Sequence, residues 1–284
     1  MHAPPQFRFD PKESLTPDGY LTPVYFNKEV LVRYSYDSRF SCEFHSDTYG
    51  TVFGSEFDIE FGVNSNGSVV AWLGDLEKLP LAERYVWLAE NKEPEANAAS
   101  EFFEGQINAE FTEEPSALRC LNALERLNNG FHQKFSDFLY HERSIEARIE
   151  EARRYKRMIL DSVDDFKRFV TELNEIINER INNSQLRKFL DARSLAYADG
   201  AKGNKLLEVV YRGVLGDSSN LIAPFYYLYD IRLWAAHNMS DEKLTEVARK
   251  LGKAPVANSD LWEALVAELE RSSNRLHGLV EALT

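Results

Sequence analysis

The chain has 284 residues, which suits two domains of ordinary size, and 44% of them are hydrophobic, enough for packed cores. Its formal net charge of −13 excludes a protein that binds nucleic acid through a generally basic surface, so any RNA contact must be a local site. The cysteines, Cys42 and Cys120, form no disulfide or zinc pattern, and no segment is apolar enough to span a membrane. We therefore expect a reduced, cytoplasmic protein with no metal, no cofactor and no membrane contact.

Residues 1–20 hold four prolines among polar residues, a composition that predicts a flexible arm. Residues 21–112 are predicted to form a small β-rich domain, because several segments alternate between apolar and polar side chains. These segments are residues 30–36, 39–46, 56–63 and 68–73. Turn formers separate them at Thr48-Tyr49-Gly50 and at Asn66-Gly67, and the second pair favours a hairpin. The pattern predicts an antiparallel sheet of four or five strands, followed by a short helix at residues 81–89.

Residues 113–284 are predicted to be helical almost throughout, because their apolar side chains recur with the period of a helix. We expect the first helix to stop or bend at Asn128-Asn129-Gly130. A long helix is predicted within residues 143–182, where neither Pro nor Gly occurs. Shorter helices follow at residues 183–196 and 203–214, another begins after a Ser240 cap, and the last covers residues 260–283. The predicted fold class is α+β, a small antiparallel β-rich domain followed by an all-α bundle.

The most distinctive segment is an apolar, aromatic helix over residues 225–238, which Ser218 or Ser219 can cap. It carries Arg232 inside it and His237 at its end. Several Arg and His pairs in the chain have a similar spacing, but only this pair lies in a helix whose composition predicts burial. A buried guanidinium needs a partner or a ligand. Five residues of helix turn through about 140°, so the two side chains diverge unless the helix ends between them.

The sequence DIRLWAAHN resembles the R-x4-H motif that closes the third core helix of HEPN domains, which are all-α bundles of bacterial toxin, abortive-infection and CRISPR-associated ribonucleases. The resemblance covers the bundle from about residue 116 to residue 284. It implies a metal-independent endoribonuclease whose composite site forms when two motifs meet across a homodimer. The N-terminal segments GYLTPVYFNKEVL and FGVNSNGSVVAWLGDLEKLP resemble uncharacterised bacterial proteins, which implies no activity.

Carried over to this sequence, the resemblance makes Arg232 the residue that holds the scissile phosphate. His237 then acts as general acid or base while the RNA 2′-OH attacks. Tyr229 and Asn238 are predicted RNA-binding residues beside this pair, with Tyr229 available for stacking on a base. An antitoxin or a larger defence complex is a possible partner of such an enzyme.

Two interpretations remain open for this helix. Arg232 could instead pair with a carboxylate and His237 could cap the helix end, and the aromatic run could be core or dimer interface. Leu233 stands where active HEPN members usually have a polar residue. The alternative function is therefore a non-catalytic HEPN-like module that dimerises and binds a ligand or protein.

Overall fold

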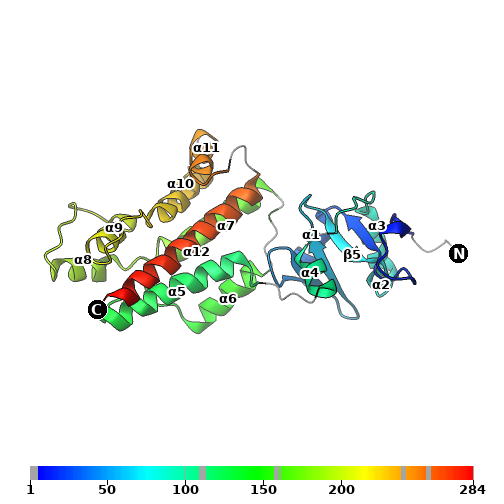
Figure 1. Cartoon of the computed structure of the whole chain (residues 1–284), viewed down its shortest axis with the longest axis horizontal. Helices are drawn as coiled ribbons and strands as arrows, with labels where there is room; N and C mark the ends of the chain where they lie inside the picture. Colours follow the sequence, from blue (N-terminus) through cyan, green and yellow to red (C-terminus); the bar gives the residue numbers. More distant parts are fainter. Residues whose placement is uncertain are drawn as a thin grey trace. The chain divides into compact units, whose positions relative to one another are not determined.

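A computed structural model describes residues 6–98, 100–108, 113–156, 160, 162–237, 241–253 and 257–283. Its contacts divide the chain into two compact units, Met1–Pro115 with Glu151–Asp161, and Ser116–Glu150 with Ser162–Thr284. The first unit contains a five-stranded antiparallel sheet and the second is helical (Figure 1), which confirms the predicted α+β class. The segment Glu151–Asp161, which the sequence assigned to the helical domain, belongs to the first unit, where the Lys156 carbonyl accepts from the backbone N–H of Phe44.

The sheet has the strand order β1-β5-β4-β3-β2, and every neighbouring pair is antiparallel. Its strands are β1 (Pro23–Phe26), β2 (Ser41–Phe44), β3 (Tyr49–Phe53), β4 (Asp58–Val63) and β5 (Val69–Trp72). The short helices of this unit include η1 (Pro11–Glu13), α1 (Glu29–Tyr36), α2 (Leu73–Leu76), α3 (Leu81–Ala89) and α4 (Glu101–Ile107). Residues 81–89 are therefore a helix, as predicted.

Both faces of the sheet are covered. One face forms the apolar core with α1 and with Trp87 of α3. On the other face, Phe102 of α4 packs against Trp72 with ring centroids 5.1 Å apart. Gly62 lies so close to α4 that an added Cβ would be 2.9 Å from the Cβ of Phe102. Because helices cover both faces, β1 and β5 are buried along their whole length.

The prediction of a strand at residues 30–36 is wrong, because this segment forms α1. Its apolar residues fit both periods, and the buried ones, Val30, Leu31 and Tyr34, make one helical face. The predicted turn at residues 48–50 is also wrong in part, because β3 begins at Tyr49. Gly50 is needed inside this strand because a Cβ there would lie 2.6 Å from the ring of Phe61.

Residues 6–20 of the predicted arm lie against the β-rich unit. Phe7 packs edge-on against Phe26 with ring centroids 5.8 Å apart, and the hydroxyl of Tyr25 donates to Glu13 at 2.8 Å. The hydroxyl of Tyr20 donates to the buried Asp75 at 2.6 Å. These contacts give the proline-rich arm a defined place that its composition did not predict.

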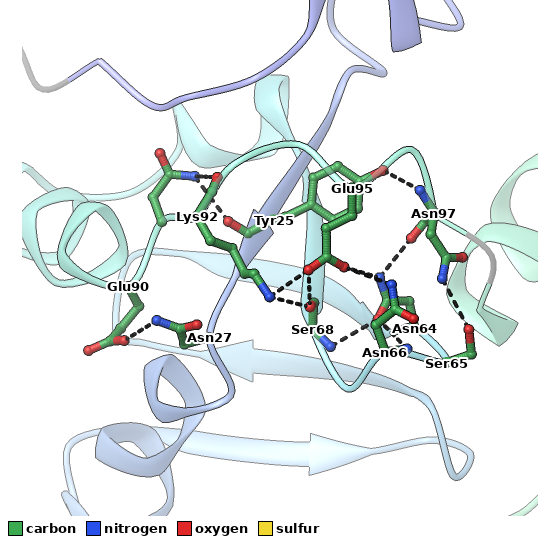
Figure 2. A network of polar contacts seen from close by, with 11 residues as sticks. Tyr25, Asn27, Asn64, Ser65, Asn66, Ser68, Glu90, Lys92, Glu95 and Asn97 are labelled. Carbon is green, nitrogen blue, oxygen red and sulfur yellow. Dashed lines mark hydrogen bonds and ion pairs between the residues drawn. The ribbon is translucent and has the colours of Figure 1, made fainter.

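A carboxylate anchors the connector after α3 to the hairpin between β4 and β5 (Figure 2). Glu95 accepts hydrogen bonds from Asn64 at 3.1 Å and from Ser68 at 2.9 Å, and forms an ion pair with Lys92. Burial alone would raise the pKa of Glu95, but the bonds from Lys92, Asn64 and Ser68 outweigh it and lower the pKa from 4.5 to about 2. The charged form of Glu95 therefore stabilises the fold above pH 4.5.

Replacing this carboxylate should remove stability in a pH-dependent way. Since the folded pKa is below the unfolded one, Glu95 contributes on the order of 2–3 kcal/mol at neutral pH, and this contribution disappears as the pH falls from about 4.5 to about 2. We expect Glu95→Gln to lower the free energy of urea unfolding at pH 7 and to converge with the wild type near pH 2. The exposed Glu93→Gln variant is the control. Equal losses at pH 7 and pH 2 would contradict the ionic role.

The helical unit is built on two long helices that run side by side, α5 and α12 (Figure 1). Its helices are α5 (Ser116–Phe135), α7 (Val163–Ile177), α8 (Asn183–Asp191), α9 (Asn204–Gly213), α10 (Ala223–His237), α11 (Asp241–Lys250) and α12 (Asn258–Ala282). Helix α6 (Ile145–Tyr155) begins in this unit, and its residues from Glu151 onward belong to the first unit. The single long helix predicted within residues 143–182 is wrong, because α6 and α7 are separate. Ser162 caps α7 by accepting from the backbone N–H of Asp165 at 3.1 Å.

The predicted stop at residues 128–130 is also wrong, because α5 continues to Phe135. Asn128 is buried and uses its amide to bind the backbone of Tyr140, accepting from its N–H at 3.0 Å and donating to its carbonyl at 3.3 Å. Gly130 makes room for α12, since an added Cβ would be 2.7 Å from Nδ1 of His277. Both residue types serve tertiary contacts here instead of ending the helix.

A side chain at Gly130 should therefore destabilise the helical unit. We expect Gly130→Ala to lower the free energy of unfolding by about 1 kcal/mol or more, because the clash with His277 outweighs the roughly 1 kcal/mol by which alanine favours a helix over glycine. In a His277→Ala background the same substitution should become stabilising. Urea unfolding of the four proteins measures both effects, and the same sign in both backgrounds would contradict the packing account.

Candidate functional site

The helix with the Arg and His motif is α10, which packs against α7, α11 and α12. Its buried side consists of Phe225, Leu228, Ile231 and Trp234. The helix begins at Ala223, so the prediction that Ser218 or Ser219 caps it is wrong. The carboxylate of Asp217 instead accepts from the backbone N–H groups of Ser219 and Leu221, both at 2.7 Å, and fixes the loop that leads into α10.

Tyr229 and Arg232 lie three residues apart on α10 and therefore share one side of the helix. Tyr229 is 45% exposed, and the side chain of Arg232 is 30% exposed. Tyr229 also lines a pocket of about 350 Å³ beside this helix. The structure thus brings these two predicted site residues to the same partly exposed surface.

Arg232 has a carboxylate partner, Glu179, which the sequence did not reveal. One terminal nitrogen of the guanidinium lies 3.5 Å from Oε1 of Glu179, whose side chain is 50% exposed. The buried Nε of Arg232 has no hydrogen-bond partner among the described residues. A guanidinium has five N–H donors, so this single long contact leaves most of its capacity for another ligand.

His237 is the last residue of α10, and the helix does not end between Arg232 and His237. The two residues therefore stand about 140° apart around one continuous helix. The side chain of His237, the whole of Asn238 and the predicted cap Ser240 lie outside the part of the chain that the structure describes. Within one chain, the helix geometry does not bring the motif residues to one face.

One carboxylate and three asparagine amides connect Arg232 to the neighbouring helices. Glu179 accepts from Nδ2 of Asn174 at 3.1 Å, and Oδ1 of Asn174 accepts from Nδ2 of Asn178 at 2.9 Å. Asn178 also donates to the carbonyl of Phe225 at 3.1 Å. Asn204, at the start of α9, donates to the same carbonyl at 3.1 Å. This network fixes the C-terminal end of α7 and the start of α9 to the first turn of α10.

Sequence reasoning missed Glu179 and the three asparagines of this network. A signal was present, because residues 174–183 contain four asparagines in a region otherwise predicted as helix. Asparagine is a poor residue for a helix interior and favours caps and specific hydrogen bonds. Such a concentration marks a place where the chain changes direction or uses amides to join elements.

Tyr226, one turn before Tyr229, also lines the pocket. Its hydroxyl donates to Glu208 of α9 at 3.0 Å. Burial, together with the negatively charged Glu208, raises the pKa of Tyr226 to about 12. The hydrogen bond to Glu208 holds the ring of Tyr226 in one orientation.

Among the described residues, no group of three or more His, Cys, Asp or Glu side chains is placed to hold a metal ion. No helix in this part of the chain has the length and apolarity needed to cross a membrane. The sequence matches no protein-family model, and no curated protein or solved structure is significantly similar to it. The HEPN resemblance therefore stays a prediction from the motif.

The amide network should contribute measurably to stability. We expect Asn174→Leu to lower the free energy of unfolding by about 1–3 kcal/mol, because Asn174 is only 1% exposed and its removal leaves Asn178 with one acceptor fewer. The same substitution at Asn129, which is exposed on α5, should change stability by less than about 0.5 kcal/mol. Urea unfolding measures both, and equal effects would contradict a specific role for the network.

Proposed function

We propose that the helical unit binds RNA through the face of α10 that carries Tyr229 and Arg232, and that the protein is a metal-independent endoribonuclease of the bacterial toxin or antiphage-defence type. The observation that carries this proposal is the arrangement of these two side chains. A partly used guanidinium and an exposed phenol ring stand side by side on one helix. A guanidinium suits a phosphate and an aromatic ring suits a base.

The helix geometry supports a composite site in a homodimer. Since Arg232 and His237 stand about 140° apart on one continuous helix, a site that needs both must take them from two copies. Arg232 of one copy would hold the scissile phosphate. His237 of the other would accept the proton of the attacking 2′-OH or donate one to the leaving 5′-oxygen. We place this enzyme in the cytoplasm, with the β-rich unit as sensor and an antitoxin or defence complex as its restraint.

A specific observation favours the alternative, a non-catalytic module that uses the same helix for dimerisation and for binding a ligand or protein. Arg232 already has Glu179 as a partner, and the residue after it, Leu233, offers no polar group for catalysis. In this alternative the guanidinium is a structural tie between α7 and α10. The two candidates differ in whether RNA is cut.

Cleavage of total RNA and transfer RNA by the purified full-length protein in EDTA tests the proposal. We expect the wild type to cut without metal. We also expect Arg232→Ala and His237→Ala each to lower the rate by about 100-fold or more. A general acid or base such as His237 contributes about that much, and so does a charged group that stabilises the transition state, such as Arg232. The matched controls Arg168→Ala and His141→Ala, both at exposed positions of the helical unit, should leave the rate unchanged.

The oligomeric state decides the meaning of a negative result. No cleavage by a wild type that light scattering shows to be a dimer favours the non-catalytic module. Cleavage by a monomer, or cleavage that survives both substitutions, would contradict the composite site.

A further inference from the structure

Helix α6 exposes most of its surface within the described part of the chain. Every residue from Ser144 to Glu150 is exposed, and two of them are large and apolar. Ile145 is 64% exposed and Ile149 is 48% exposed. A helix of 11 residues is barely stable by itself in water, and most helices in proteins are stabilised by packing an apolar face. The two isoleucines are therefore the part of α6 that a further surface would stabilise.

The contacts that hold the beginning of α6 leave these isoleucines uncovered. The hydroxyl of Ser144 accepts from the backbone N–H of Ala147 at 3.1 Å and caps the helix. Arg148 forms an ion pair with Glu125 of α5 at 3.5 Å. These polar contacts set where α6 starts and tie it to the helical unit, but they bury neither isoleucine.

The apolar residues of α6 share one side of the helix. Ile145, Ile149 and Ala152 follow each other at intervals of four and three residues, which is the spacing of a coiled-coil seam. Exposed apolar residues that are scattered singly are normal on a protein surface. Here two isoleucines stand one turn apart and in line with an alanine, so they make a continuous strip. Such a strip fits the corresponding strip of another helix.

Charges of opposite sign lie beside the two ends of this strip. Glu146 lies next to it near the start of α6, and Arg153 follows seven residues later on the same side of the helix. Both residues are exposed. An acidic residue near the start of a helix and a basic one near its end also suit the helix dipole. The dipole does not account for the isoleucines between them, which a partner helix would.

This arrangement of charges is complementary to itself. In an antiparallel pair of α6 helices, Glu146 of each copy lies beside Arg153 of the other, so the same ion pair forms twice about a two-fold axis. A parallel pair would instead bring Arg148 of one copy near Arg153 of the other, and their like charges oppose it. The charges therefore favour a second copy of this chain, in antiparallel orientation, as the occupant of the strip.

We propose that α6 is a contact between two copies of this chain, in which the strips of Ile145, Ile149 and Ala152 pack antiparallel. A helix of 11 residues buries less area than a standard interface, so we expect a Kd on the order of 10–100 µM. Helix α10 packs on α7, α11 and α12, whereas α6 is tied to α5. The contact goes beyond the composite site proposed at α10, and it does not require that the chain cut RNA.

Sedimentation equilibrium of the full-length protein from about 1 to 300 µM tests this contact. We expect a monomer–dimer equilibrium for the wild type. Ile145→Ser combined with Ile149→Ser should raise the Kd by about tenfold or more, because both apolar side chains are buried only in the dimer. The matched control is Leu81→Ser combined with Tyr85→Ser on α3. These two residues have the same spacing, are 59% and 48% exposed, and should leave the Kd unchanged.

Charge reversal tests the orientation of the two helices. Glu146→Arg alone and Arg153→Glu alone each place like charges together at both ends of the contact, and each should raise the Kd by about threefold or more. The two substitutions combined should restore the Kd to within about twofold of the wild type, because opposite charges meet again. Loss of the helix would give the reverse order, since the combined variant opposes the helix dipole at both ends. Weaker association in the combined variant than in either single one overturns the antiparallel pairing.

The remaining outcomes separate this contact from the nuclease proposal. A wild type that stays monomeric up to about 300 µM overturns the contact. A dimer that the isoleucine substitutions leave intact also overturns it, and assigns dimerisation to another surface, such as α10. A wild type that dimerises through the isoleucines but cuts no RNA supports the contact and contradicts the nuclease. Sedimentation is measured without cleavage, so the two proposals can fail separately.

Discussion

The polar interior of the helical unit depends on one backbone atom, the carbonyl oxygen of Phe225. Amides from the end of α7 and the start of α9 both donate to it. Because these elements are distant in the sequence, the shared acceptor fixes three helix ends relative to each other. One carbonyl therefore sets the packing of these helices, and the amides that bind it belong to residues that line the pocket beside α10.

Buried and half-buried carboxylates join elements in the same way in the β-rich unit. Glu95 ties the connector after α3 to the hairpin, and Glu83 accepts from Tyr34 at 2.7 Å and from Arg33 at 2.9 Å. Glu101 accepts from the hydroxyls of Ser46 and Thr48. Part of the acidic excess is thus used inside the fold, where each carboxylate has several donors.

The proposed RNA face of α10 and the pocket beside this helix meet at Tyr229. Arg232 lies beside Glu179, and Glu179 in turn lines the pocket. The amide network joins the two, because Asn174 bonds to both Glu179 and Asn178.

The sequence by itself determined the division into a β-rich and a helical part. It also determined the helix at residues 81–89 and placed Arg232 and His237 on one apolar helix. All three features depend on the local periodicity of apolar side chains. Only the tertiary structure decided that residues 30–36 form a helix, since their pattern fits two periods and packing on the sheet selects one. It also decided that α5 continues through Gly130. Glycine often ends a helix, but here it leaves space for the side chain of His277. Glu179, the partner of Arg232, lies 53 residues away, and Asn178 meets Phe225 across 47 residues. Contacts between residues so far apart produce no periodic pattern in the sequence. The partners of Arg232 and Phe225 could therefore be identified only from the packed helices.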